Sequence, residues 1–236
     1  MNRFKKYIEE LKNKGFYYFC LARFNYITRY LLAYKKLLKV NQTFSHNGQV
    51  FHYFYHPYNA TWDNERAVEI PLALSFLVKC ANKNILEVGN VLSHYVPTSH
   101  DIIDKFEVAP GVLNEDVAFF RTKKKYDCII SISTLEHVGW DETPKNPTKM
   151  LDAVHNLYSI LKPKGVLFFT VPLGYNPHMD KAIADKKLRD ISFSFLKRVS
   201  KDNHWKQCKW KEAKDLPYGF PYLNATAIAI GVFTKN

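Results

Sequence analysis

The sequence lacks the features that mark disulfide-rich, zinc-binding or membrane-spanning proteins. Its 236 residues include four cysteines, which lie far apart and form no C-x-x-C pair, so we expect neither a disulfide framework nor a metal site. No basic region followed by an uninterrupted apolar run opens the chain, and no stretch approaches the roughly 20 apolar residues that span a bilayer. The sequence therefore predicts a protein of the reducing cytoplasm.

The positive charge of the chain is concentrated at one end. The formal net charge is +12, and residues 1–40 hold ten basic and two acidic side chains, so they carry +8 of it. A basic segment confined to an appendage argues against a nucleic-acid groove that crosses the whole domain. It is more typical of an element that docks on a membrane surface or a partner.

The chain is expected to have two parts, an N-terminal extension at 1–59 and a main domain at 60–236. Residues 2–39 show helical spacing of apolar and basic side chains, which fits a docking helix or a helix that simply caps the domain. Asn47-Gly48 lies between two β-prone runs and predicts a hairpin with a type I′ turn. Residues 60–81 are expected to form a helix that Pro71 kinks or divides.

From Asn84 onward, short apolar runs alternate with amphipathic stretches. The runs are rich in Ile, Val and Phe, and they lie at 85–88, 101–106, 126–133, 165–172 and 225–234. A stretch at 149–165 places its apolar residues on one helical face and stops at Lys-Pro-Lys-Gly. Such alternation predicts an α/β domain with a largely parallel sheet and helices on both faces. Ligands of such sheets bind beyond the carboxyl ends of the strands.

Three segments at those strand ends carry a resemblance to a known family. They are "ILEVGN" (85–90), "YDCIISISTLEHV" (126–138) and "LKPKGVLFFTVP" (161–172). In this order they resemble the first-strand motif, the fourth strand and the turn into the fifth strand of the class I S-adenosylmethionine-dependent methyltransferases. The resemblance covers roughly residues 60–180. It implies a Rossmann-like fold, S-adenosylmethionine as cofactor, S-adenosylhomocysteine as product, and methyl transfer (EC 2.1.1.-).

The resemblance implies roles for polar residues at the strand ends. Asp104 would accept hydrogen bonds from both ribose hydroxyls, unless it pairs with a surface lysine instead. Asp116 would receive the adenine amino group, with Glu115 as the alternative and an exposed loop as the other interpretation. Gly89 would let the backbone approach the cofactor, and Glu87 would order the loop from beneath. The predicted cofactor-binding residues are Glu87, Gly89, Asn90, Asp104, Asp116, Ser133 and Thr134.

The loop after the first strand departs from the family pattern at Val91 and Ser93, where the family usually has glycine. A β-branched residue does not readily take a positive φ, so Val91 excludes any loop conformation that needs one there. S-adenosylmethionine has no phosphates and does not need the row of backbone amides that a pyrophosphate demands. The departure therefore argues more strongly against a dinucleotide site than against a methyltransferase.

Two histidines are candidates for the base that a hydroxyl acceptor requires. His137 follows the fourth strand, where cofactor and acceptor would meet, and His178 in the loop after the fifth strand is the alternative. Each could instead be a packing or surface residue. The predicted acceptor-binding residues offer hydrogen bonds, a cation for phosphate or carboxylate, or an aromatic face for a sugar. They are Arg66, Tyr175, Asn176, Arg198 and Trp205.

Missing motifs narrow the acceptor. The Asn/Asp-Pro-Pro-aromatic motif of methyltransferases that act on base or amide nitrogens is absent after the fourth strand. G-x-G-x-x-G is absent as well, which ranks an NAD-dependent oxidoreductase last among the possible functions. The pattern, with "NERAVEIP" (64–71), resembles small methyltransferases found with bacterial and viral surface-glycan genes. That resemblance implies O-methylation of a sugar or polar substituent of a capsule or O-antigen polysaccharide, with a glycan or sugar nucleotide as acceptor.

Two other functions stay open. An RNA or other nucleic-acid methyltransferase is motivated by the +12 charge and the 15% aromatic content, and it would bind nucleic acid in a salt-dependent way. A non-catalytic relative would use the basic N-terminal helix to dock on a complex or on the inner surface of the cell membrane.

Overall fold

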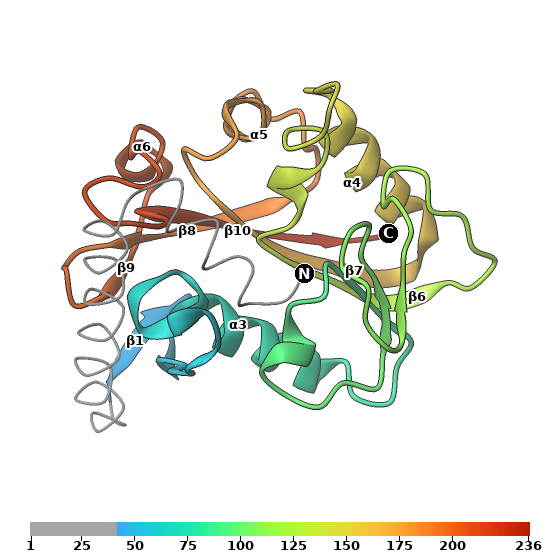
Figure 1. Cartoon of the computed structure of the whole chain (residues 1–236), viewed down its shortest axis with the longest axis horizontal. Coiled ribbons are helices and arrows are strands. Elements are labelled where there is room, and N and C mark those ends of the chain that lie inside the picture. Colours follow the sequence, from blue (N-terminus) through green and yellow to red (C-terminus); the bar gives the residue numbers. More distant parts are fainter. Residues whose placement is uncertain (1–41) are drawn as a thin grey trace, which may run out of the picture. The chain divides into compact units, whose positions relative to one another are not determined.

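The computed structural model describes residues 42–236 (Figure 1). Residues 43–236 form one compact unit. The predicted N-terminal helix at 2–39 lies outside the described residues, so its docking role stays a prediction. None of the described helices is long and apolar enough to cross a membrane.

An eight-stranded sheet organises this unit, and five of its strands are parallel. The last three strands in the spatial order alternate in direction, because β10 is antiparallel to both neighbours and β9 is antiparallel to β8. In spatial order the strands are β5 (Val112–Leu113), β4 (Asp101–Ile103), β3 (Ile85–Val88), β6 (Tyr126–Ile132), β7 (Leu161–Pro172), β10 (Ala227–Thr234), β8 (Ser192–Arg198) and β9 (Trp205–Cys208).

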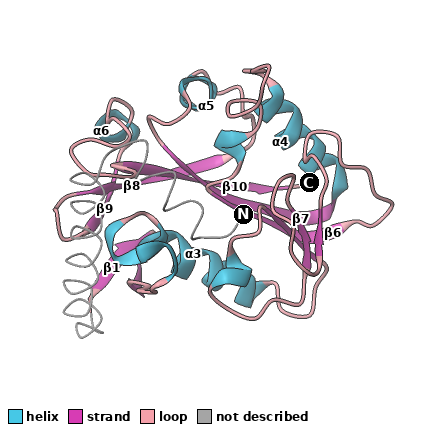
Figure 2. Cartoon of the chain, in the orientation of Figure 1, coloured by secondary structure: helices cyan, strands magenta, loops and turns pink. Residues whose placement is uncertain are grey.

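Helices cover both faces of the sheet, which confirms the predicted Rossmann-like α/β fold class (Figure 2). Along β6 the side chains alternate, so Ile129 packs in the core beneath α4 while Ile130 packs in the core beneath α3. The α-helices are α3 (Arg66–Lys79), α4 (Lys149–Ile160), α5 (Pro177–Ala184) and α6 (Trp210–Ala213), and short 3₁₀ helices lie at η1 (Tyr58–Asp63), η2 (Leu92–His94) and η3 (Leu135–His137).

The segment predicted as one helix at 60–81 forms two. A 3₁₀ helix is followed by Asn64 in extended conformation, and α3 then begins at Arg66. Pro71 lies inside α3 and has no N–H to donate to the Ala67 carbonyl one turn earlier. That carbonyl instead accepts a hydrogen bond of 2.9 Å from the Phe54 N–H. The segment before the helix thereby satisfies the backbone group that proline leaves unpaired.

The predicted hairpin is confirmed. Strands β1 (Thr43–His46) and β2 (Gln49–His52) pair antiparallel around Asn47 and Gly48, which both have positive φ as a type I′ turn requires. The sequence placed this hairpin in an extension at 1–59, but it belongs to the same compact unit as the sheet. One reason is that Gln207 on β9 bonds both the backbone N–H and the side chain of Asn47.

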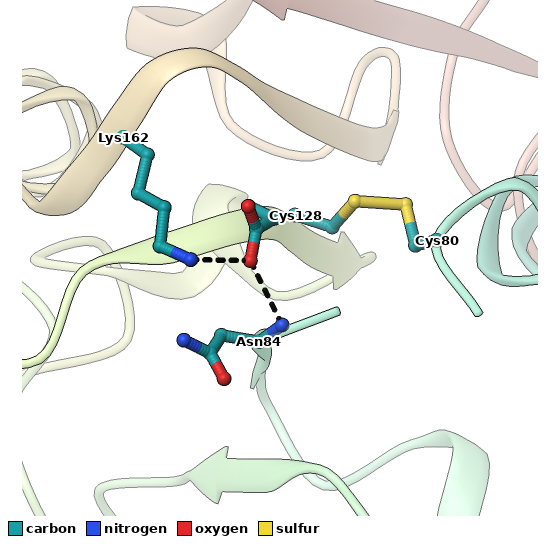
Figure 3. The surroundings of a disulfide bond; sticks show 5 residues. Cys80, Asn84, Cys128 and Lys162 are labelled. Atoms are coloured by element: carbon teal, nitrogen blue, oxygen red, sulfur yellow. Dashed lines mark hydrogen bonds and ion pairs between the residues drawn. A yellow bond between two sulfur atoms is a disulfide. The ribbon is translucent and has the colours of Figure 1, made fainter. Parts of the chain in front are cut away.

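The prediction that the cysteines form no disulfide is wrong. Cys80, directly after α3, is bonded to Cys128 near the start of β6, 48 residues further along the chain (Figure 3). Such a pairing follows from how α3 packs on the sheet, which the spacing of the cysteines does not reveal. Because the expectation of a reducing compartment rested on unpaired cysteines, the disulfide removes that argument.

Candidate functional site

A cavity of about 490 Å³ opens at the carboxyl ends of β3, β4 and β6, between the loops that follow them. The chain adds strands to opposite sides of β3 here: β4 lies on one side of it, and β6, which comes later in the chain, lies on the other. Ligands of open α/β sheets bind at such a point. The sequence-predicted residues that line this carboxyl-edge cavity are Arg66, Gly89, Asn90, Asp104, Asp116, Ser133, Thr134 and His137.

The loop after β3 rests on a buried carboxylate. Glu87 has no exposed surface, and its Oε1 accepts hydrogen bonds from the backbone N–H groups of Val91 (3.0 Å) and Leu92 (2.8 Å). The other oxygen, Oε2, lies 2.7 Å from His100 Nε2. The structure thus places Glu87 beneath the loop and outside the cavity.

Gly89 takes a φ of +86°, and a Cβ there would lie 2.1 Å from Thr134 Oγ1. The need for glycine therefore comes from the side chain of Thr134 in the neighbouring loop. Val91 keeps a φ of −100°, within the range that β-branched residues adopt. Ser93 lies in η2 and donates a hydrogen bond of 2.5 Å to Asn90 Oδ1. The two departures from the family pattern are accommodated without further positive φ values.

Asp104 is occupied by backbone amides. Its Oδ1 accepts from the N–H groups of Phe106 and Glu107, both at 2.8 Å, and its Oδ2 accepts from the Asn90 N–H at 3.1 Å. The side chain therefore links the turn after β4 to the loop after β3. Glu107 reaches the cavity from this turn, and its Oε1 lies 2.8 Å from Asn90 Nδ2 and 2.9 Å from His94 Nε2.

Asp116 lies in a compact network of four charges. Lys105 and Lys149 both contact Asp116 Oδ2, at 2.8 and 2.6 Å, and both contact Glu142 Oε2, at 2.7 and 2.5 Å. Burial would raise the pKa of Asp116, but the hydrogen bonds from the two lysines outweigh it and lower that pKa. The second oxygen, Oδ1, accepts from the Ala118 N–H. This carboxylate is thus held on both oxygens by the protein itself.

Arg66, Glu69 and Ser133 connect the start of α3 to the end of β6. Arg66 Nη1 contacts Glu69 Oε2, and Ser133 Oγ donates a hydrogen bond of 2.6 Å to Glu69 Oε1. Burial would lower the pKa of Arg66, but Glu69 and Glu65 outweigh it and raise the pKa. Arg66 lines the cavity with its charge compensated by a buried carboxylate.

Glu136 is a fully buried carboxylate without a hydrogen bond to any residue of the described part of the chain. Its Oε1 lies 3.6 Å from His137 Nε2. Burial raises the pKa of Glu136 well above its ordinary value, and the charge of Glu69 adds to this effect. A buried carboxyl group with a raised pKa therefore lies next to the His137 imidazole.

His137 lies on the cavity wall and is held by a carboxylate. Its Nδ1 lies 2.5 Å from Asp141 Oδ2, which also accepts a hydrogen bond of 2.6 Å from the Tyr175 hydroxyl. Burial would raise the pKa of Asp141, but hydrogen bonds from Tyr175 and His137 lower it. Asp141 therefore carries a negative charge beside the imidazole. Tyr175 supports this pair, and its ring contacts the His137 ring at a centroid distance of 4.7 Å.

The predicted residues after β7 do not line the carboxyl-edge cavity; they are Tyr175, Asn176 and His178. Asn176 is buried, and its Oδ1 accepts from the N–H groups of His178 and Met179, while its Nδ2 donates to the Glu136 carbonyl. It is the N-cap of α5, so its predicted contact with the acceptor is wrong. His178 packs against Trp140 with ring centroids 5.6 Å apart and does not line the cavity, so its role as an alternative base stays a prediction.

Arg198 and Trp205 are structural, which corrects their predicted roles in acceptor binding. The buried Arg198 guanidinium donates to the carbonyls of Asp63, Ser200 and Lys201 and lies over the Tyr222 ring. Trp205 is 4% exposed, and its Nε1 donates to Asn203 Oδ1. Both side chains are therefore used to hold backbone and side-chain groups of the protein itself.

Sequence reasoning missed several residues of this region. Glu107, Asp141 and Glu69 hold or complete the site, and Tyr58 and Tyr95 present aromatic rings to the cavity. The spacing of His137 and Asp141, four residues apart, and the Glu-Arg pattern of "NERAVEIP" were the available signals. Among residues 42–236 no group of three His, Cys, Asp or Glu side chains is arranged to hold a metal ion.

No protein-family model matches the chain. No curated protein matches it either. Several solved structures do, at low identity. The N-methyltransferase NodS from Bradyrhizobium japonicum WM9, in complex with S-adenosylhomocysteine, is 13% identical over 73% of this chain and 89% of its own, with a TM-score of 0.48. An rRNA methylase from Streptococcus thermophilus is 10% identical over 71% and 97%, with a TM-score of 0.44.

A third similar structure is an S-adenosylmethionine-dependent methyltransferase from Clostridium acetobutylicum ATCC 824. It is 10% identical over 70% of this chain and 91% of its own, with a TM-score of 0.38. None of these similarities assigns a residue its role in this chain.

Proposed function

We propose that the chain is an S-adenosylmethionine-dependent methyltransferase that O-methylates a sugar or a polar substituent in surface polysaccharide biosynthesis. The observation that carries the proposal is the His137–Asp141 pair on the wall of the carboxyl-edge cavity. The same cavity holds the Gly89 loop and the acidic turn after β4. The proposal thus rests on a histidine–carboxylate pair that lines a cofactor-sized cavity.

The residues of the cavity fit this cofactor. Its volume of about 490 Å³ lies within the usual range for small-molecule sites. Five carboxylates line it against the two cations Arg66 and Lys105, a balance that suits a positively charged sulfonium. Apolar walls from Val88, Ile103 and Val117 suit an adenosyl group. When bound, the cofactor supplies an electrophilic methyl group.

We assign the ribose hydroxyls to Glu107, because the side chain of Asn90 is buried and already bonds Glu107 and Ser93. Both oxygens of Asp104 already accept from backbone amides, so its part is to fix the loop from which Asn90 extends. Glu107 reaches the cavity and its side chain is 38% exposed, which leaves its carboxylate accessible to a ligand. The adenine would lie toward the turn at Asp116, whose lysine network fixes the loop.

His137 acts as the base in this proposal. With Asp141 accepting the Nδ1 proton, the Nε2 lone pair of the neutral imidazole is available to a hydroxyl proton. Asp141 stabilises the imidazolium that then forms, as in other carboxylate–histidine pairs. A positioned base of this kind contributes about 10²–10⁴-fold to the rate.

The aromatic rings of Tyr58 and Tyr95 support a sugar acceptor, because an aromatic face packs well against the apolar face of a sugar. Arg66 also lines the cavity, but Glu69 compensates its charge. We therefore assign Arg66 to hydrogen bonding with acceptor hydroxyls, which favours a glycan over a phosphate-bearing acceptor.

The test combines binding and turnover. Calorimetric titration is expected to show binding of S-adenosylmethionine and S-adenosylhomocysteine, and Glu107→Ala is expected to weaken both. His137→Ala is expected to keep that binding while methyl transfer to a panel of capsule and O-antigen sugars falls by about 10²–10⁴-fold. His178→Ala is the matched control and should retain activity. A folded protein that binds neither cofactor form contradicts the proposal.

A further inference from the structure

A second cavity lies at the opposite edge of the sheet. Its volume is about 790 Å³, and it is formed by the β1–β2 hairpin, the second half of α3, the first residues of β6, and parts of β7, β8 and β10. Cys128 on its wall lies near the start of β6, and Ser133 of the carboxyl-edge cavity directly follows the end of that strand, five residues later, a separation of roughly 17 Å. It is therefore separate from the carboxyl-edge cavity.

The floor of this cavity is apolar. Phe76 from α3 and Phe168 from β7 stack with ring centroids 5.1 Å apart. Leu72 and Ile230 extend the same surface, and Phe51 from the hairpin closes one side. The disulfide between Cys80 and Cys128 forms part of the wall and joins α3 to the sheet at this point (Figure 3). A hydrocarbon group is the chemistry that such a floor accepts.

The rim has the opposite character. Lys79, Lys83 and Lys164 are exposed there, and the rim carboxylate, Asp127, is already 2.7 Å from Lys162. Asp127 also accepts a hydrogen bond of 2.9 Å from the Asn84 N–H. The lining thus holds three exposed lysines and one carboxylate that is already paired with Lys162, and the surplus positive charge favours an anion at the entrance.

We propose that this lysine-rimmed groove binds a single-chain anionic amphiphile of the alkyl phosphate class. The hydrocarbon chain lies on the aromatic floor between α3 and the sheet. The phosphate stays at the rim, where Lys79, Lys83 and Lys164 contact it. The proposal is independent of methyl transfer, because no residue of the groove lines the carboxyl-edge cavity.

His46 and three serines also line the groove without changing this assignment. His46 Nε2 lies 2.7 Å from Ser194 Oγ, and burial lowers the pKa of His46, so it adds no charge at neutral pH. Ser75 on α3 lines the groove, and its side chain is half-buried. A nucleotide would need hydrogen-bonding groups on the floor for its base, where this groove offers Phe76, Phe168 and Leu72.

The test is calorimetric titration of the full chain with decyl phosphate below its micellar concentration, beside decyl maltoside, inorganic phosphate and uridine monophosphate. Decyl phosphate is expected to bind more tightly than the other three. The double substitution Lys83→Glu with Lys164→Glu should weaken binding by about tenfold or more, through reversed charge at the rim. Ser75→Trp should weaken it by filling the apolar part.

Controls separate these effects from general changes. Lys181→Glu in α5, combined with Lys187→Glu in the segment that follows it, makes the same change of net charge away from the groove and should leave binding unchanged. Circular dichroism confirms that every variant is folded. Equal binding of decyl maltoside would overturn the role of the lysines, and equal binding of uridine monophosphate would overturn the apolar chain. No binding of decyl phosphate to the folded wild-type chain would overturn the proposal altogether.

Discussion

A Cβ on residue 89 would lie 2.1 Å from Thr134 Oγ1, and 2.8 and 3.0 Å from Thr134 Cγ2 and Cβ. The two loops that form the centre of the carboxyl-edge cavity therefore touch at this point, and Gly89 is the only residue type that fits. The Thr134 side chain is held in this position by its own hydrogen bond, since its Oγ1 donates to the Ile132 carbonyl at 3.0 Å. The cavity is shaped by this contact before any ligand is bound.

Gly89→Ala is expected to lower the free energy of unfolding by roughly 2–5 kcal/mol, because it combines a positive φ with steric overlap. Urea unfolding measures the effect. The double variant Gly89→Ala with Thr134→Ala should recover part of the loss, since it removes two of the three short contacts and leaves the backbone strain. If Gly89→Ala is as stable as the wild type, the two loops do not touch in this way.

Asp141→Asn is expected to reduce methyl transfer while cofactor binding stays unchanged. The asparagine keeps the size of the side chain but removes the negative charge that stabilises the His137 imidazolium. Initial rates and calorimetric titration together test this. Tyr175→Phe removes one of the two hydrogen bonds to Asp141 and should have a smaller effect on the rate. A loss of cofactor affinity equal to the loss of rate would contradict the assignment.

Cys80→Ser with Cys128→Ser is expected to lower the free energy of unfolding by roughly 3–4 kcal/mol. The bond closes a loop of 48 residues, and its loss increases the entropy of the unfolded chain. Urea unfolding of the wild type with and without a reducing agent should reproduce the difference. Cys208→Ser is the control, because Cys208 is the free cysteine of the described residues and should not respond. Identical midpoints with and without the reductant would show that the bond does not form.

The fold class could be predicted because its signals are local. The apolar runs at 85–88 and 126–133 coincide with β3 and β6, and the Asn47-Gly48 turn lies where the hairpin closes. The start of β7 was harder to place, since it begins at Leu161 directly after α4 and passes through a positive φ at Lys164. Its register shift against β6 is decided by packing across the sheet.

The site was predicted less completely, because roles depend on contacts between distant segments. Asp104 lies at the expected strand end, yet three backbone amides occupy its carboxylate, and this follows from how two loops meet. Arg198 and Asn176 have the side chains of binding residues, but the protein uses them to satisfy its own backbone. Only the folded structure shows which polar side chains are already bonded within the protein and which can still bind a ligand.

The stability of the protein is expected to depend on pH through Asp180, in the first turn of α5. Its Oδ2 accepts a hydrogen bond of 2.9 Å from the Gly174 N–H, while Oδ1 is buried without a hydrogen bond to any residue of the described part. Burial raises the pKa of Asp180 from 3.8 to about 6, against the opposing effect of the Gly174 hydrogen bond. The folded protein therefore holds a proton that the unfolded chain releases.

It follows that stability from this group is fully present below about pH 4 and is lost as the pH rises to about 6. Asp180→Asn removes the titration, so its stability relative to the wild type should rise across that window by up to roughly 3 kcal/mol and then level off. Urea unfolding at intervals from pH 3.5 to about pH 7.5 measures the difference. Asp185→Asn, at the exposed end of the same helix, should show no comparable rise. A difference between Asp180→Asn and the wild type that stays constant from about pH 4 to about pH 7 would show that Asp180 titrates as it does in the unfolded chain.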